Sequence, residues 1–389
     1  MVIGGKMSLL IHDLSQEDWE KVKDQYDVWD IVDANDDNHP CIGCFGCWAK
    51  TPGECVIKDG FNSMGERIHK ADKVTVISRY TYGGFSGAVK NVFDRSLGYV
   101  LPQFEISGNE THHKRRYEED KEFTFIFYGH GLSEEEKASA VRYVTAVCAN
   151  VRSHVGSVEF LETEEKYPRH RDVNIGAEKT SATVFLNGSM RGTGGNSGKI
   201  AAKVAELLNT ETETVELRKH LGDMDGLVEK LENAGTMILC MPLYVDSVPS
   251  QMIRLMETFE RSYKGGSKKI YLISNMGLYE SSQLVNIFEA VKQWCCRMGF
   301  EYCGGLGVSA GELQGVLMQA LPFRNGPTRK IALGAEKLAA AISSGEKTED
   351  TFAEPHLFPR KLFMWIANYS WNVNARNNGI SPKDLYRQL

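Results

Sequence analysis

The stretch Ser181–Leu208 reads SATVFLNGSMRGTGGNSGKIAAKVAELL. Its apolar and β-branched run at Thr183–Leu186 predicts a buried strand, and the spacing of apolar residues over Ile200–Leu208 predicts a helix. A loop of small and hydroxyl-bearing residues separates the two. Such a loop directs free backbone N–H groups and the positive end of the helix dipole at one point. The stretch therefore predicts an anion site at the amino end of this helix.

Several side chains of the loop can add hydrogen-bond donors to that site. Five carry hydroxyl, amide or guanidinium groups: Ser189, Arg191, Thr193, Asn196 and Ser197. Two common nucleotide loops are excluded, because Ile200 follows Lys199 where a P-loop needs Ser or Thr, and Ser197 stands where a dinucleotide fingerprint needs glycine. The alternative is an ordinary glycine-rich turn without a ligand.

Length and composition restrict the class of protein. A chain of 389 residues predicts two domains, and 42% hydrophobic with 25% charged residues is typical of a globular protein. The formal net charge of −6 gives no general attraction to nucleic acid or to an anionic membrane. No apolar run approaches the roughly 20 residues of a membrane span, and the N-terminus lacks the pattern of a signal peptide. We expect a cytoplasmic location.

Strands alternate with helices in two successive series, which predicts two α/β domains, each with a five-stranded, doubly wound parallel sheet. The first series contains Lys73–Ser78, which Thr236–Met241 repeats in the second, and this indicates an internal duplication. The predicted strand order is 2-1-3-4-5 in each sheet. The expected boundaries are residues 1–162 for the first domain, 163–180 for a linker, 181–345 for the second domain and 346–389 for a C-terminal arm that packs on the body or on another subunit.

In a sheet of this order a ligand binds beyond the carboxyl ends of strands one and three. In the second domain the loop after strand three is Met241–Pro249, in which Tyr244 offers a ring face to a flat heterocycle and the backbone of 243–247 could reach its polar edge. The loop after strand four, Asn275–Tyr279, lies on the same predicted edge, and its Gly277 would allow close approach. Taken alone, each loop could be a plain surface turn, but three loops at one edge favour a binding site.

Asn187–Arg191, Pro242–Tyr244 and Asn275–Tyr279 resemble the three FMN loops of the flavodoxin-like NADPH-dependent FMN reductase family. The resemblance implies a phosphate site at Ser189, Arg191, Asn196 and Ser197. It places the flavin ring at Pro242, Leu243, Tyr244 and Asp246, with Asn275 and Gly277 closing the far side. The expected cofactor-binding set also includes the neighbouring Thr193, Val245, Ser247, Met276 and Tyr279.

The same resemblance implies an oxidoreductase in which FMN carries the chemistry and no side chain acts as the central acid or base. Hydride would pass from NADPH or NADH to FMN, and then to a flavin, a quinone, a nitro compound or a redox protein. A homodimer is the expected assembly. Two alternatives stay open: an electron-transfer protein that works with a ferredoxin-like partner, and a flavin-binding protein without catalytic activity.

Four cysteines, Cys41, Cys44, Cys47 and Cys55, lie within fifteen residues of the first half. Their spacing resembles the compact motif of iron–sulfur flavoproteins in the same superfamily. A [4Fe–4S] cluster, a zinc ion and a metal-free thiol loop are the three interpretations. Because this half has no phosphate loop, we expect one FMN per chain, bound by the second half.

Two other features of the first half give weaker predictions. Residues 105–121 are polar and charged, which favours a surface insertion with His112 and His113 in a solvated loop; the alternative is contact with an acidic substrate or with the phosphate of NADPH. Tyr80 and Tyr82 either border the nicotinamide or substrate pocket or lie half-exposed at a rim.

Overall fold

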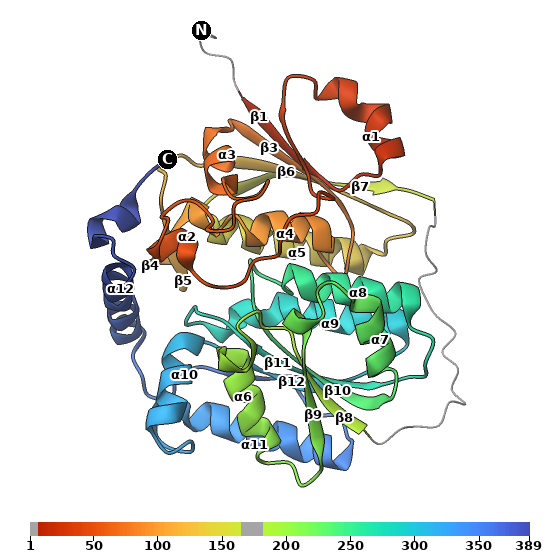
Figure 1. Ribbon diagram of the computed structural model, residues 1–389, viewed down its shortest axis with the longest axis vertical. Coiled ribbons are helices and arrows are strands. Elements are labelled where there is room, and N and C mark those ends of the chain that lie inside the picture. Colours follow the sequence, from red (N-terminus) through yellow and green to blue (C-terminus); the bar gives the residue numbers. More distant parts are fainter. Residues whose placement is uncertain (1–6, 165–181) are drawn as a thin grey trace. The chain divides into compact units, whose positions relative to one another are not determined.

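The computed structural model describes residues 7–164 and 182–389, and the chain divides into two compact units (Figure 1). Unit 1 comprises Met1–Lys166 together with Met364–Leu389, and unit 2 comprises Tyr167–Phe363. Each unit is an α/β fold built on a parallel sheet, as predicted. Residues 165–180 of the expected linker (163–180) lie outside the described residues.

The sheet of unit 1 has the strand order β2-β1-β3-β6-β7, which is the predicted 2-1-3-4-5 order once an intervening hairpin is set aside. Its strands are β1 Ser8–His12, β2 Asp30–Asp33, β3 Lys73–Arg79, β6 Glu122–Gly129 and β7 His154–Glu162. All four pairings are parallel. The helices are α1 Gln16–Val22, α2 Gly46–Ala49, α3 Met64–Lys70, α4 Gly87–Asp94 and α5 Glu134–Asn150, with short 3₁₀ turns at Lys23–Gln25 and Leu97–Tyr99.

The charged segment at 105–121 is not a solvated loop. It belongs to an antiparallel hairpin of β4 (Val100–Ser107) and β5 (Glu110–Arg115). His112 is buried and its Nδ1 lies 2.6 Å from Asn150 Oδ1. His113 is half-buried, and desolvation of its ring lowers its pKa to about 4. The prediction of solvated histidines was therefore wrong, because the strand alternation that buries one face of the hairpin is obscured by its charges.

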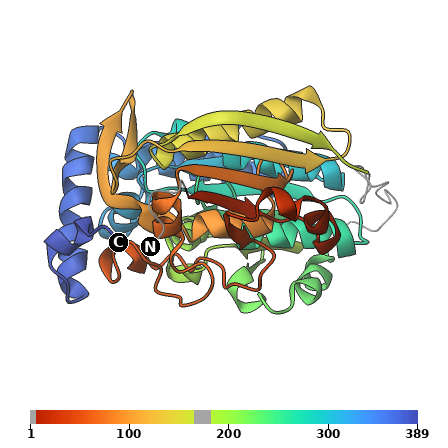
Figure 2. The same ribbon diagram turned by 90° about the horizontal axis from the view of Figure 1, so that it is seen from above.

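The C-terminal arm packs on this hairpin. Of the expected arm at 346–389, the part that packs here is α12 (Arg360–Asn377) with a 3₁₀ turn at Pro382–Tyr386. The Asn368 amide exchanges two hydrogen bonds with the Phe104 backbone, at 2.7 and 3.1 Å, and the buried Arg116 guanidinium donates to two carbonyl groups near the end of the arm. Figure 2 shows the hairpin beside α12.

The sheet of unit 2 has six strands in the order β9-β8-β10-β11-β12-β13. They are β8 Ala182–Asn187, β9 Thr212–Glu216, β10 Ala234–Pro242, β11 Lys269–Asn275, β12 Glu301–Val308 and β13 Thr351–Ala353. The first five strands follow the predicted 2-1-3-4-5 order, and β13 extends the sheet by one parallel strand that the sequence analysis did not predict.

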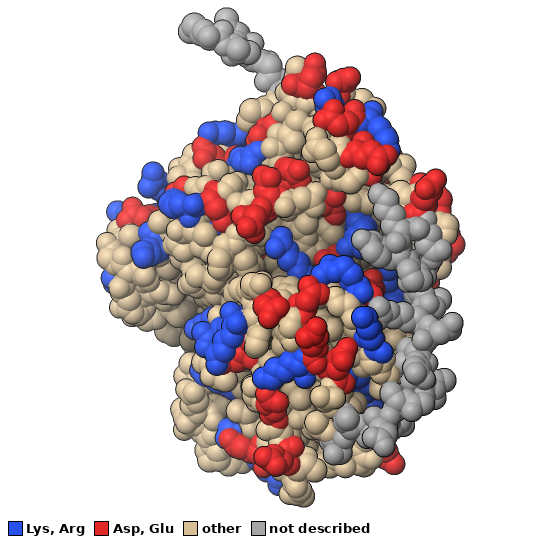
Figure 3. Space-filling model, turned by 45° about the vertical axis from the view of Figure 1, so that its right-hand side comes forward, with Lys and Arg blue, Asp and Glu red and all other residues tan. Residues whose placement is uncertain are grey.

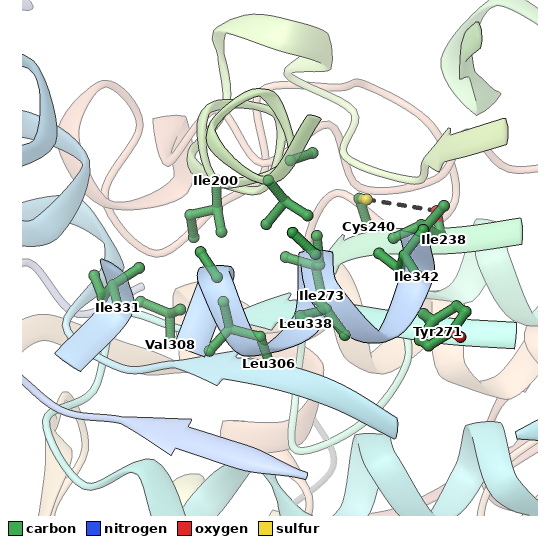
Figure 4. Close-up of a cluster of buried hydrophobic side chains, with 14 of the residues drawn as sticks. Ile200, Ile238, Cys240, Tyr271, Ile273, Leu306, Val308, Ile331, Leu338 and Ile342 are labelled. Atoms are coloured by element: carbon green, nitrogen blue, oxygen red, sulfur yellow. Dashed lines mark hydrogen bonds between the residues drawn. The ribbon is translucent and has the colours of Figure 1, made fainter. Parts of the chain in front are cut away.

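Helices cover both faces of this second sheet (Figure 1). They are α6 Asn196–Ala205, α7 Met224–Leu231, α8 Ser250–Ser262, α9 Val285–Met298, α10 Gly311–Ala320 and α11 Arg329–Ser344, with 3₁₀ turns at Gly192–Gly194, Leu217–Lys219, Ser281–Leu284 and Gly326–Thr328. On one face, a core of buried residues joins α6 and α11 to the sheet through Ile200, Leu338 and Ile273 (Figure 4). Burial of this apolar surface fixes the amino end of α6 against the strand ends.

Candidate functional site

The three loops singled out in the sequence follow neighbouring strands and meet at one edge of the sheet of unit 2. The backbone N–H of Leu243 donates to Asn275 O at 2.8 Å, and that of Gly188 donates to Cys240 O at 2.8 Å. The buried Ser197 hydroxyl donates to Asn275 Oδ1 at 2.5 Å. These bonds tie the loop before α6 to the loops after β10 and β11, so the three loops form one continuous edge.

The amino end of α6 has the features of an anion site. Its N-cap residue is Gly195, no side chain caps the helix, and its first turn contains no acidic residue. The first N–H groups of a helix have no partner within the helix and lie at the positive end of its dipole. A Cβ built on the adjacent Gly194 would meet nothing within 4 Å, so the space beside this helix end is open.

The predicted phosphate residues differ in their exposure. Ser189 and Ser197 are buried, Asn196 is half-buried, and Arg191 and Thr193 are exposed. Ser189 is held in place because its N–H donates to Asn187 Oδ1 at 3.0 Å. The loop therefore presents both buried and exposed donors beside the helix end.

The Arg191 side chain is turned toward a carboxylate on another element. Its Nη1 lies 3.3 Å from Glu312 Oε1 on α10, and both side chains are about half-exposed. Competition from Glu312 therefore weakens the attraction of Arg191 for an incoming anion. The sequence analysis did not identify Glu312 as part of the site.

The loop after β10 is a tight turn in a strained conformation. Tyr244 and Ser247 exchange two backbone hydrogen bonds of 3.1 Å, and between them Val245 and Asp246 have φ values of 37° and 62°. Positive φ is unfavourable for a β-branched residue such as Val245, and strain of this kind is common where a loop holds a ligand. Residues 242–245 are half-buried, so they can offer a flat surface to a ring.

Unit 1 has the same turn after its own third strand. Thr81 and Gly84 exchange backbone hydrogen bonds of 2.9 and 3.0 Å around residues with positive φ. Tyr80 and Tyr82 next to it are buried, so the interpretation of these residues as a half-exposed rim was wrong.

Only part of the loop after β11 lies at the open edge where the sequence predicts a cofactor site. Met276 is buried, its N–H donates to Val308 O at 3.0 Å, and its carbonyl accepts from Gly311 N at 2.7 Å. The Tyr279 hydroxyl donates to Phe358 O at 2.6 Å, within unit 2 but away from α6. Gly277 is exposed, and a Cβ there would meet nothing within 4 Å. Of this loop, Asn275 and Gly277 therefore border the open edge, while Met276 holds neighbouring elements together.

Helix α10 lies against the amino end of α6 and was missed in the sequence. A Cβ at Gly315 would overlap Asn196 Oδ1, and one at Gly311 would lie 2.8 Å from Asn275 Nδ2, so two glycines allow this close packing. The glycines around 304–315 hid the helix. Ser309 and Glu312 have the sequence spacing of a capping box, which could have indicated a helix start here. In the structure the helix begins at Gly311, and no side chain caps it.

The corresponding edge of unit 1 is closed to anions. The Asp13 carboxylate, directly after β1, accepts the Arg79 N–H at 3.0 and 3.1 Å. Burial raises the pKa of Asp13 to about 6, against hydrogen bonds that lower it. Ser15 caps α1, and Glu17 and Asp18 occupy its first turn. A carboxylate thus takes backbone hydrogen bonds at the position where a phosphate would lie.

The cysteine loop, defined as residues 41–55, is close to the C-terminal arm within unit 1. The Trp371 ring lies 5.5 Å from Phe45 and 5.3 Å from Trp48, centroid to centroid. Arg95 Nε donates to Cys55 Sγ at 3.1 Å. The arm and a buried guanidinium therefore both contact this loop.

The geometry of the cysteine loop does not support the interpretation as a [4Fe–4S] cluster. Burial raises the pKa of the Cys41 thiol to about 12 and raises that of Cys47 as well, so both thiols are neutral in the chain without a metal. Across residues 7–164 and 182–389, no group of three or more His, Cys, Asp or Glu residues could hold a metal ion. The structure gives no support to a [4Fe–4S] cluster.

The edge of unit 2, in contrast, fits the phosphate of FMN. An uncapped helix end, open space at Gly194, and the buried Asn187 Nδ2, which has no hydrogen-bond partner within 7–164 and 182–389, all suit a phosphate group. Lys and Arg alternate with Asp and Glu on the face drawn in Figure 3. Among the described residues no helix is long and apolar enough to cross a membrane.

Comparison with protein-family models and with curated proteins gave no match. Several solved structures are similar over about two-fifths of this chain. One is the Trp repressor binding protein of Bacillus subtilis, with 16% sequence identity and a TM-score of 0.32. The alignment covers 40% of this chain and 96% of that protein. A second is an FMN-dependent NADH-azoreductase of Bacillus anthracis in complex with FMN, with 13% identity, a TM-score of 0.33, and coverage of 42% of this chain and 100% of that chain. A third is a flavone reductase, with 12% identity, a TM-score of 0.31, and coverage of 43% of this chain and 66% of that chain.

Proposed function

We propose that this chain is a flavin-dependent oxidoreductase that binds one FMN at the edge of unit 2 and uses NAD(P)H as electron donor. The observation that carries the proposal is the uncapped amino end of α6 at the point where the loops after β8, β10 and β11 meet. When bound there, FMN would accept hydride from NADPH or NADH and deliver electrons to a flavin, a quinone, a nitro compound or a redox protein.

The residues of the site would bind and orient the cofactor. The first N–H groups of α6, with the side chains of Ser189, Asn196 and Ser197, would hold the phosphate. The half-buried Pro242–Val245 would support the ring, and their strained turn keeps the backbone of this loop fixed. No acid or base from the chain is assigned to the central step, in accordance with the sequence analysis.

The proposal can be tested through the charge beside the helix end. Gly194 has room for a side chain, so Gly194→Glu and Gly194→Gln should both fold. The two variants have nearly the same shape, but the Glu variant places a negative charge next to the site. We expect the wild type to be purified with FMN or to take it up, the Gln variant to bind within a few-fold of wild type, and the Glu variant to bind at least about tenfold more weakly.

The experiment combines a titration of FMN fluorescence with the rate of NADPH and NADH oxidation in the presence of a quinone. A wild-type chain that never binds FMN would defeat the proposal, and so would equal binding by the Glu and Gln variants. Binding of FMN without oxidation of either nucleotide would instead favour a flavin-binding protein without catalytic activity.

A further inference from the structure

Helix α10 holds a buried polar side chain without a hydrogen-bond partner in the part of the chain that the structure describes. Gln314 has no exposed surface, and neither its Nε2 nor its Oε1 has a hydrogen-bond partner among the described residues. An amide buried without hydrogen bonds costs folding free energy, and most native proteins avoid it. A residue that violates this rule is expected to serve a ligand or a function.

The position of Gln314 on its helix indicates where that ligand would be. Gly311, Gln314, Gly315 and Met318 recur at three- and four-residue spacing and share one face of α10. Gly311 packs on Asn275, Gly315 packs on Asn196, and Met318 enters the core that includes α6. Gln314 therefore lies on the face that covers the amino end of α6.

Two independent features thus meet at one place: a ten-residue helix whose amino end has no side-chain cap, and a buried amide with free donors. Building on the FMN site proposed above, we infer that Gln314 is a phosphate-binding residue, which donates from Nε2 to the phosphomonoester of the flavin nucleotide. Helix α10 then closes the phosphate side of the site, and Gln314 favours FMN over flavins that lack the phosphate.

This role predicts opposite effects on stability and on binding. Gln314→Leu removes an unsatisfied buried amide, so the variant without ligand should melt at a higher temperature than the wild type. The same variant loses a hydrogen bond to a charged phosphate, so its Kd for FMN should rise about tenfold. Riboflavin has the same ring without the phosphate, so its Kd should be unchanged. A residue that merely supports the fold would not give this combination.

The experiment measures melting temperature without ligand, and the Kd of FMN and of riboflavin, for wild type, Gln314→Leu and Gln319→Leu. Gln319 is an exposed residue of the same helix and serves as the matched control. The inference is overturned if Gln314→Leu leaves the ratio of the Kd of FMN to the Kd of riboflavin unchanged, whether or not both ligands bind more weakly. Failure of the wild type to bind FMN would instead reject the proposed function, so the two failures can be distinguished. Should Gln314→Leu not fold, Gln314→Glu tests the same point, because its carboxylate should repel FMN much more strongly than riboflavin.

Discussion

The buried carboxylate of unit 1 should make the stability of this unit depend on pH. Burial raises the pKa of Asp13 from 3.8 to about 6. Between these values the folded chain holds the proton that the unfolded chain has released, so the free energy of unfolding falls as pH rises and levels off above pH 6. The interval from 3.8 to about 6 corresponds to about 3 kcal/mol. Asp13→Asn keeps the shape of the side chain but never ionises, so this fall should disappear.

Urea unfolding at pH values from 4.5 to 7.5 tests this prediction. Tryptophan fluorescence reports mainly on unit 1, because five of the six tryptophans belong to it and only Trp294 lies in unit 2. The advantage of Asp13→Asn over wild type should grow with pH toward about 3 kcal/mol, less the cost of rearranged hydrogen bonds. The exposed Asp27 provides the control, since Asp27→Asn should follow the wild-type curve. Parallel curves for wild type and Asp13→Asn would refute the reasoning.

Three further changes have expected outcomes. Val245→Gly relieves an unfavourable φ of 37° and should stabilise unit 2 by about 1 kcal/mol in thermal unfolding, and a loss of stability would contradict the strain. Glu312→Gln releases Arg191 from an exposed ion pair, so FMN should bind a few-fold more tightly at low salt, with the gain lost at high salt. Trp371→Ala uncovers the cysteine loop and should speed its reaction with a thiol reagent, whereas Tyr369→Ala, on the exposed side of α12, should not.

The sheets were predictable from the sequence because their strands are buried on both faces. Runs such as Val74–Ile77 and Met237–Met241 are almost continuously apolar, and helices alternate with them regularly. This pattern predicts a parallel sheet, and the 2-1-3-4-5 order follows from the doubly wound fold. The three loops of unit 2 were found in the same way, since carboxyl ends of neighbouring parallel strands must share an edge.

The elements that the sequence analysis missed depend on tertiary contacts. Charges dominate β5, yet His112 is buried because Asn150 provides its hydrogen bond. β13 has only three residues, which is too short for a periodic signal. Helix α10 contains two glycines, which weaken its helical signal but allow it to approach Asn196 and Asn275. Local pattern cannot reveal contacts between distant residues, and for that reason the pairing of Arg191 with Glu312 was not foreseen.

The two units differ in charge at one equivalent point, the end of the first strand. In unit 1 the Asp13 carboxylate accepts the backbone N–H of Arg79, and Glu17 and Asp18 occupy the first turn of the following helix. In unit 2 the equivalent loop is rich in glycine, and the first turn of α6 has no acidic residue. Both units nevertheless keep the same tight turn after the third strand. Because a phosphate dianion is repelled by buried or clustered carboxylates and attracted by an uncapped helix end, the shared fold can hold FMN in unit 2 while unit 1 satisfies the same edge with its own side chain.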